Sequence, residues 1–205
     1  MKVNAKFLRS VADAAYFPPL GPPEIAFLGR SNVGKSSLIN SLLGEKMAHT
    51  SSTPGRTRTI NFFEVRRPGK PRAEWVFADL PGYGYAKLPR ERTAEWPKFI
   101  EPYLKTREAL ALCVVLVDAN VPTQHSDQQL VEWLQHVGRP HVIVATKADR
   151  HSGNTLTHAL QRLRNDFQSE RIAPFSARTG TGRDELWKEI IASGEDLGSS
   201  DRLTG

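Results

Sequence analysis

A lysine and a serine directly follow a pair of glycines whose spacing suits phosphate binding. The pattern G-x-x-x-x-G-K-[ST], with the serine after it, covers Gly29, Arg30, Ser31, Asn32, Val33, Gly34, Lys35, Ser36 and Ser37. The glycines let backbone N–H groups close around a phosphate, and the start of a helix adds partial positive charge. The ammonium of Lys35 would reach β- and γ-phosphate oxygens, and the hydroxyl of Ser36 would bind Mg²⁺. This stretch therefore predicts a site for a nucleoside triphosphate.

An acidic element follows the apolar run at 74–78 and consists of Asp79, Leu80, Pro81 and Gly82. A carboxylate that ends a buried strand is costly to bury without a partner, and in nucleotide sites it can hold Mg²⁺ through water. The N–H group of Gly82 could face a γ-phosphate. We therefore predict that Asp79 and Ser36 serve the same metal ion.

Two later elements predict which base is bound. Thr146, Lys147, Ala148 and Asp149 end the apolar run that begins at residue 141. The carboxylate of Asp149 can accept hydrogen bonds from the N1–H and 2-amino groups of guanine, a donor pair that adenine lacks. Threonine stands at position 146, where the common pattern has asparagine. Further along, the stretch Phe175, Ser176 and Ala177 would offer a backbone N–H to the guanine O6, so the ligand predicted is GTP or GDP.

The polar loop at 44–59 supplies the other nucleotide contacts that we expect, from Gly55, Arg56, Thr57, Arg58 and Thr59. A threonine in this loop could place its hydroxyl on Mg²⁺ and its backbone near the γ-phosphate. Such a contact exists only with the triphosphate, which would make this loop and the loop at 80–95 a switch. Thr53, Thr57 and Thr59 all compete for that role.

Apolar runs and helical periodicity alternate along the chain and indicate the elements that must position these residues. Strands are expected at 24–29, 60–65, 74–79, 110–118, 141–146 and about 171–175, with a short one possible at 3–9. Helices are expected at 35–43 and around 96–104, 130–137, 156–167 and 181–191. The turn residues between 60–65 and 74–79 predict an antiparallel hairpin, and Pro102 predicts a kink or break in its helix. The class is α/β, with a mostly parallel sheet covered on both faces.

Composition bounds the setting in which the protein works. No run of 18 apolar residues is present, the N-terminus lacks the apolar core of a secretion signal, and Cys113 is the only cysteine, so we expect a cytoplasmic protein without membrane contact. Residues 1–107 carry 18 Lys and Arg against 9 Asp and Glu, whereas residues 108–205 carry 10 against 13. This uneven balance indicates either a polyanionic partner such as RNA or a solvated surface with a few phosphate ligands.

The chain most closely resembles the EngB family of bacterial ribosome-biogenesis GTP-binding proteins. The resemblance rests on PEIAFLGRSNVGKSSLINSL, TPGRTRTINFF, DLPGYGYAK, TKAD and FSARTG, which together span residues 23 to 180. It implies a Ras-like P-loop GTPase fold of three layers, with a six-stranded sheet containing one antiparallel strand, and binding of GTP and Mg²⁺. It also implies association with the large ribosomal subunit, here through the basic surface in 1–107, and a role in cell division and septation.

The resemblance also guides the assignment of residues and domains. It favours Thr57 as the loop threonine, so the predicted metal ligands are Ser36, Thr57 and Asp79. We expect an N-terminal extension and proline-rich connector at 1–22, one GTPase domain at 23–193 and a disordered tail at 194–205. A monomer is expected.

The residue after Gly82 is Tyr83, where Ras-like enzymes carry the glutamine that orients the attacking water. We therefore expect slow intrinsic hydrolysis that depends on Lys35, Asp79, Thr57 and Gly82. Asn32 occupies the position at which potassium-activated relatives carry an asparagine, so it either holds K⁺ beside the phosphates or only shapes the loop. A module that holds nucleotide and binds RNA without turnover is the alternative function.

Overall fold

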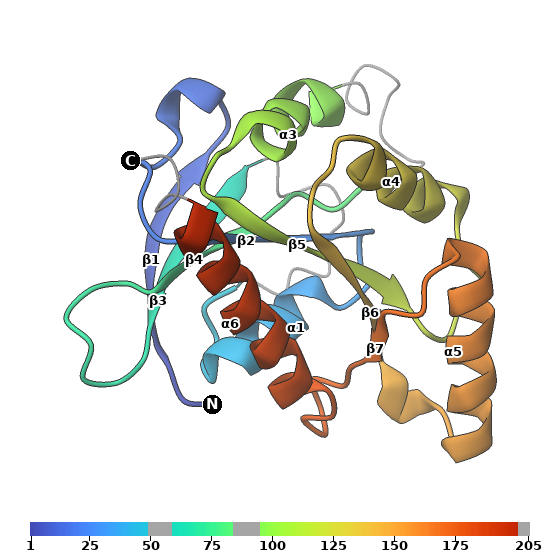
Figure 1. Ribbon diagram of the computed structural model, residues 1–205. Coiled ribbons are helices and arrows are strands. Elements are labelled where there is room, and N and C mark those ends of the chain that lie inside the picture. Colours follow the sequence, from blue (N-terminus) through green and yellow to red (C-terminus); the bar gives the residue numbers. More distant parts are fainter. Residues whose placement is uncertain (49–58, 84–94, 201–205) are drawn as a thin grey trace.

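A single sheet of seven strands lies between two layers of helices in this computed structural model, which describes residues 1–48, 59–83 and 95–200 (Figure 1). The order across the sheet is β1-β3-β4-β2-β5-β6-β7. The strands are β1 (Asn4–Val11), β2 (Glu24–Gly29), β3 (Ile60–Arg66), β4 (Trp75–Asp79), β5 (Leu110–Asp118), β6 (His141–Thr146) and β7 (Ile172–Pro174). The predicted fold class is confirmed, and the strand that the sequence left open at the N-terminus is β1, at the edge of the sheet.

The central strands are parallel, and their side chains are buried on both faces because the helical crossovers that join them cover both sides of the sheet. β2 pairs in parallel with β4 and β5, and β5, β6 and β7 continue the parallel arrangement. β3 runs antiparallel to both β4 and β1, which confirms the predicted hairpin. Cys113 lies buried in β5, where burial raises the pKa of its thiol to about 12, so the thiol is a small apolar side chain at neutral pH.

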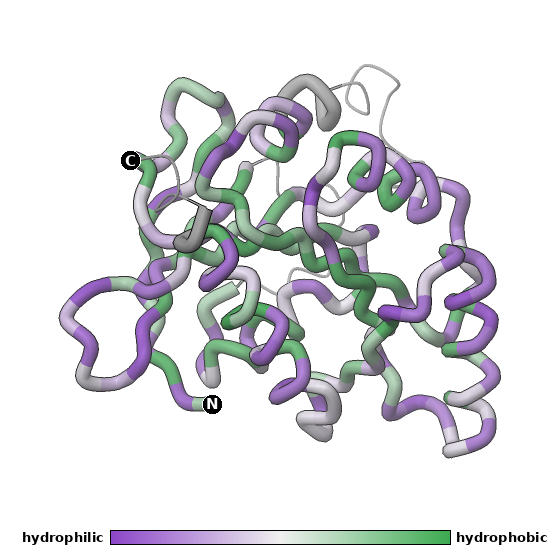
Figure 2. Tube along the Cα trace, viewed as in Figure 1, coloured by the Kyte–Doolittle hydropathy of each residue, from purple (hydrophilic) through white to green (hydrophobic). Residues whose placement is uncertain are grey.

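The helices divide between the two faces of the sheet (Figure 1). α1 (Lys35–Leu43) and α6 (Arg183–Ser200) cover one face, where Trp187 packs on Trp75 and Phe77. α3 (Glu95–Thr106), α4 (His125–His136) and α5 (Gly153–Phe167) cover the other, and short 3₁₀ turns lie at η1 (Ala14–Tyr16) and η2 (Ala148–Arg150). Figure 2 shows apolar residues along the strands and mostly polar ones on the outer sides of the helices. None of the described helices is long and apolar enough to cross a membrane.

Two sequence-based expectations differ from the structure. The helix does not break at Pro102: α3 continues through it, because Ile100, Tyr103 and Leu104 are buried on both sides of the proline and their packing outweighs one lost hydrogen bond. The predicted disordered tail is also wrong up to Ser200, since α6 runs on past residue 194. Gly194 allows this close packing: a Cβ there would lie 3.4 Å from both Pro23 Cγ and Trp75 Nε1.

A buried carboxylate joins the N-terminal connector to α3. Glu24 is 1% exposed and accepts hydrogen bonds from the Tyr103 hydroxyl, at 2.8 Å, and from the Arg107 guanidinium. Arg107 also donates to the carbonyl of Pro18, at 2.7 Å. Each charged group is therefore paired and hydrogen-bonded, which a buried ion pair requires.

Replacing Glu24 with alanine would leave the Arg107 charge and the Tyr103 hydroxyl without their shared partner. We expect Glu24→Ala to lower the free energy of unfolding by about 3–5 kcal/mol, the usual cost of breaking a buried pair. The control is Glu74→Ala, which removes the half-exposed pair with Arg67 and should cost about 0–1 kcal/mol. Urea unfolding measures both, and equal losses would contradict a structural role for the Glu24 cluster.

Candidate nucleotide-binding site

The carboxyl ends of the parallel strands meet at one edge of the sheet, and the elements predicted to bind nucleotide leave from that edge. The phosphate loop follows β2, Asp79 ends β4, Thr146 ends β6, and Phe175 comes one residue after β7. Ligands of open α/β sheets bind outside the carboxyl ends of the strands. The topology therefore brings together four segments that are far apart in the sequence.

The glycines of the phosphate loop are required by close packing and by backbone conformation. A Cβ on Gly29 would lie 2.7 Å from Val33 Cγ1 and 3.1 Å from the carbonyl oxygen of Leu116. Gly34 has a φ of +107° and directly precedes α1. Its carbonyl accepts the first bond of the helix, from the Leu38 N–H at 2.9 Å. A side chain at either glycine would thus change the shape of the loop.

The first turn of α1 presents donors suited to an anion. The N–H groups of Lys35, Ser36 and Ser37 precede the first intrahelical hydrogen bond and have no acceptor within the helix. The helix macrodipole places partial positive charge at the same point. These features fit a phosphate group, which would accept hydrogen bonds from the free N–H groups.

Lys35 and Asp79 form an ion pair at the carboxyl edge of the sheet. The Lys35 ammonium donates to Asp79 Oδ1, and the side chains are only 11% and 6% exposed. Ser36 follows Lys35 in the first turn of α1. A hydroxyl and a carboxylate are oxygen ligands of the kind Mg²⁺ prefers, with other positions left to phosphate and water. Ser36 and Asp79 supply such oxygen atoms. Within the described ranges, no cluster of three or more His, Cys, Asp or Glu could hold a metal.

Backbone pairing holds the segment after β4 against the phosphate loop. The Tyr83 N–H donates to the Gly29 carbonyl at 3.3 Å, and the Ser31 N–H donates to the Tyr83 carbonyl at 3.2 Å. Gly82 packs closely against Ser31, because a Cβ on Gly82 would lie 3.0 Å from Ser31 Oγ. Leu80 is fully buried, and its N–H bonds the Phe27 carbonyl at 3.2 Å. Leu80 and Pro81, predicted as nucleotide ligands, thus lie in the chain that places Gly82 beside the cradle.

The side chain of Tyr83 packs against the hydrophobic core on the α3–α4 face of the sheet. Burial, and then the charge of Asp127 on α4, raise the pKa of Tyr83 well above its usual value. Burial also raises the pKa of Asp127, although Tyr83 and Arg30 act in the opposite direction. The Tyr83 side chain thus lies among protein groups, close to Asp127 and Arg30.

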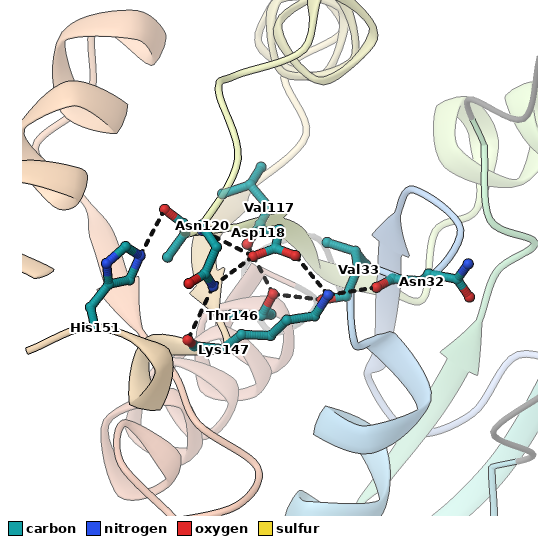
Figure 3. Close-up of polar contacts among 9 residues, drawn as sticks. Asn32, Val33, Val117, Asp118, Asn120, Thr146, Lys147 and His151 are labelled. Atoms are coloured by element: carbon teal, nitrogen blue, oxygen red, sulfur yellow. Dashed lines mark hydrogen bonds and ion pairs between the residues drawn. The ribbon is translucent and has the colours of Figure 1, made fainter. Parts of the chain in front are cut away.

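Side chains at the end of β6 hold the phosphate loop from its other side (Figure 3). The Thr146 hydroxyl lies 2.6 Å from the Val33 carbonyl oxygen and 3.0 Å from that of Val117, and these two acceptors share its hydrogen. Lys147 crosses the loop and donates to the Asn32 carbonyl at 2.9 Å. Threonine at position 146 therefore links the base-binding element to the cradle through its hydroxyl, a function that the sequence pattern did not reveal.

Asp118 is a site residue that sequence reasoning missed. Its carboxylate accepts from Lys147 Nζ at 2.6 Å and from the backbone and side-chain N–H groups of Asn120 at 3.0 and 2.9 Å. Burial would raise the pKa of Asp118, but these hydrogen bonds outweigh it, and the pKa lies below its usual value. The signal was present in the sequence, since Asp118 ends an apolar strand just as Asp79 does.

Asp149 lies beside the turn that follows β7. Its carboxylate accepts from the Ser176 hydroxyl at 2.7 Å and from Arg178 Nε at 2.8 Å. These contacts, led by the Ser176 hydrogen bond, hold the pKa of Asp149 below its usual value, so the group is ionised at neutral pH and accepts hydrogen bonds. The Ser176 N–H donates to the Thr181 carbonyl at 3.0 Å. Of the two N–H groups predicted to face the guanine O6, those of Ser176 and Ala177, that of Ala177 has no acceptor among the described residues.

The remaining predicted residues divide between the described and undescribed parts of the chain. Phe175 and Ala148 join the base-binding segments, because the Ala148 N–H donates to the Phe175 carbonyl at 3.1 Å. Thr59 is described, and its hydroxyl contacts Asn61 Oδ1 at 3.4 Å. Four predicted ligands lie outside the described residues: Gly55, Arg56, Thr57 and Arg58.

Comparisons with known proteins agree with this geometry. Residues 24–147 match a family described as 50S ribosome-binding GTPase. A protein named probable GTP-binding protein EngB from Koribacter versatilis (strain Ellin345) is 62% identical over 197 residues, 96% of this chain and 97% of that protein. Its counterpart from Acidobacterium capsulatum is 58% identical over 93% of this chain and 90% of that protein. A crystal structure of a probable GTP-binding protein engB has a TM-score of 0.68 at 22% identity, covers 84% of this chain and 99% of that one, and supports the fold.

Thr146 offers a test of the link between the base-binding element and the cradle. Thr146→Val keeps the shape of the side chain but removes the donor to the Val33 carbonyl, a bond worth about 1–1.5 kcal/mol. We expect affinity for GDP and GTP to fall by about fivefold to tenfold, measured by calorimetry. Thr146→Ser keeps the hydroxyl and should bind as the unaltered protein does, so equal affinities of the two variants would rule out the link.

Proposed function

Because the chain belongs to the EngB family of GTP-binding proteins, we propose that it is a guanine-nucleotide switch that hydrolyses GTP slowly. The observation that supports this most strongly is the direct connection between the base-binding and phosphate-binding elements. Asp149 presents an ionised carboxylate held by Ser176, and the neighbouring Lys147 reaches the backbone of the phosphate loop. A ligand that contacts both elements must carry a base with two adjacent donors and a phosphate chain, which describes GTP and GDP.

The residues at the carboxyl edge divide the nucleotide between them. The N–H groups of the phosphate loop and the first turn of α1 bind the phosphates, and the Lys35 ammonium turns from Asp79 toward them. Ser36, Asp79 and Thr57 hold Mg²⁺, which neutralises phosphate charge when bound. Gly82 donates its N–H to the γ-phosphate, and Asp149 and Ala177 bind the guanine edge.

Hydrolysis is slow in this proposal because no side chain replaces the water-orienting glutamine at position 83. The partly buried Tyr83 ring packs against the core, anchors the segment after β4 and leaves Gly82 beside the cradle. Positive charge beside the phosphates would be a separate means of stabilising the transition state. Asn32 is the residue of the loop that we consider for this role.

Two observations bear on Asn32, and each favours a different role. Its φ of +65° is tolerated by asparagine better than by most residues, and its carbonyl is held by Lys147, so its backbone shapes the loop. Its side chain is exposed, and in Figure 3 the amide extends away from the Lys147 contact, so the amide oxygen is available as a ligand for K⁺. Held there, K⁺ would place positive charge beside the phosphates.

Substitution by glycine separates these roles, because glycine adopts positive φ without cost but has no side chain. If Asn32 holds K⁺, GTP turnover by the unaltered protein should be faster in KCl than in NaCl, and Asn32→Gly should abolish that difference. If Asn32 only shapes the loop, Asn32→Gly should keep its turnover while Asn32→Ala loses it. Phosphate release measures the rates. Lys35→Ala is the inactive control, and turnover that survives in this control would contradict the assigned site.

We further propose that the switch acts in assembly of the large ribosomal subunit in the cytoplasm, as a monomer, and thereby supports cell division and septation. The description of the matching family as 50S ribosome-binding, and the basic balance of residues 1–107, support this partner. The loops at 44–59 and 80–95 carry the residues assigned to the γ-phosphate. Loss of that phosphate would therefore change the surface they form and release the protein.

Cosedimentation with purified large ribosomal subunits tests the switch. We expect more protein in the pellet with a non-hydrolysable GTP analogue than with GDP, because only the triphosphate contacts Gly82 and Thr57. Asp149→Ala, which removes the guanine contacts, should show no dependence on nucleotide. Equal pelleting of the unaltered protein in both nucleotides would contradict the switch and favour the alternative, a nucleotide-holding module that binds RNA.

A further inference from the structure

β1 forms one edge of the sheet and carries exposed positive charge. Within the described residues it pairs with β3 alone, so its outer backbone groups have no neighbouring strand. Lys6 and Arg9 are exposed on this strand, and Lys2 is exposed just before it. Charged residues on an edge strand discourage pairing with another strand, and they also provide contacts for a polyanion.

The loop between β3 and β4 extends this positive charge. Figure 1 shows the loop projecting from the sheet beside β1, and Figure 2 shows that it is hydrophilic. Arg66, Lys70 and Arg72 are exposed there, whereas Arg67 is paired with Glu74. The register places Asn4 opposite Arg66, so the loop continues directly from the amino-terminal end of β1.

The acidic residues near this surface leave most of the cations unpaired. Glu74 is paired with Arg67, Glu64 is half-buried opposite Lys6, and Glu45 accepts a hydrogen bond from the Ala5 N–H at 3.4 Å. None of the ion pairs among the described residues includes Lys2, Lys6, Arg66, Lys70 or Arg72. We call the exposed cations Lys2, Lys6, Arg9, Arg66, Lys70 and Arg72 the basic edge.

The basic edge is connected to the nucleotide site through consecutive strands. The Ser10 hydroxyl of β1 donates to Asn61 Oδ1 of β3 at 2.5 Å. Asn61 in turn lies opposite Asp79 in the register of β3 and β4. β3 also begins at Ile60, immediately after the loop that contains Thr57. A change in that loop on GTP hydrolysis would thus act on the strand to which the basic edge is attached.

We propose that the basic edge binds ribosomal RNA by contacts to the phosphate backbone. This inference rests on the proposed function and assigns its RNA contact to one surface, on the β1 side of the molecule. RNA is the partner we favour because this surface presents several spaced cations that no ion pair among the described residues includes, an arrangement suited to successive phosphates.

The test is the triple variant Lys6→Gln, Arg66→Gln, Arg72→Gln, matched by the control triple Lys105→Gln, Arg171→Gln, Lys188→Gln, which removes equal charge from exposed positions elsewhere. The probe is deproteinised RNA of the large ribosomal subunit, titrated over a salt series. At about 100 mM salt the edge triple should bind at least about tenfold more weakly. Its slope of log K against log salt should fall by about 2–3, since each lost phosphate contact removes about 0.7–0.9. The control triple should change little, and both should hydrolyse GTP at the unaltered rate.

The outcomes distinguish this surface from the proposed function as a whole. Equal weakening of both triples, or none in the edge triple, would overturn the basic edge. Weaker binding of the edge triple to intact subunits, with RNA affinity unchanged, would overturn RNA in favour of a ribosomal protein. If the unaltered protein fails to pellet with subunits while the edge triple still loses RNA affinity, the ribosomal function is wrong and the RNA surface stands.

Discussion

The contact between the end of β6 and the backbone of the phosphate loop is the interaction on which the rest of the site depends. Thr146 holds the Val33 carbonyl, and Lys147 holds the Asn32 carbonyl. Lys147 and Asn32 both have left-handed backbones, with φ of +58° and +65°. Such conformations cost about 1 kcal/mol or more for residues other than glycine, and they persist where neighbouring contacts over-determine them. The strained pair thus fixes the position of the end of β6 relative to the phosphate loop.

The opposite side of the loop is held by the segment after β4. The backbone of Tyr83 pairs with Gly29 and Ser31, and Lys35 reaches Asp79. The end of β6 therefore holds the phosphate loop through contacts that do not involve the γ-phosphate. The segment after β4 holds the other side of the loop and carries Gly82, which is assigned to that phosphate. This asymmetry suits a switch, because only one of the two supports needs to move when the phosphate is lost.

Tyr83 has different surroundings from those expected of the glutamine that Ras-like enzymes carry at this position. In Ras-like enzymes the residue at this position orients water, whereas the Tyr83 ring packs in the core near Asp127 and Arg30. Its backbone pairing with Gly29 and Ser31 contributes to the position of Gly82.

The sequence by itself determined the order of strands and helices, the hairpin at β3 and β4, the phosphate loop and the guanine element. These depend on local spacing, turn residues and apolar runs, which can be read along the chain. Only the tertiary structure decided that Thr146 holds the phosphate loop, that Asp118 orients Lys147, that Tyr83 turns inward and that α6 continues past Gly194. Each of these is a contact between residues distant in the sequence, made by packing at the sheet edge or on its face, and local patterns carry no record of such partners.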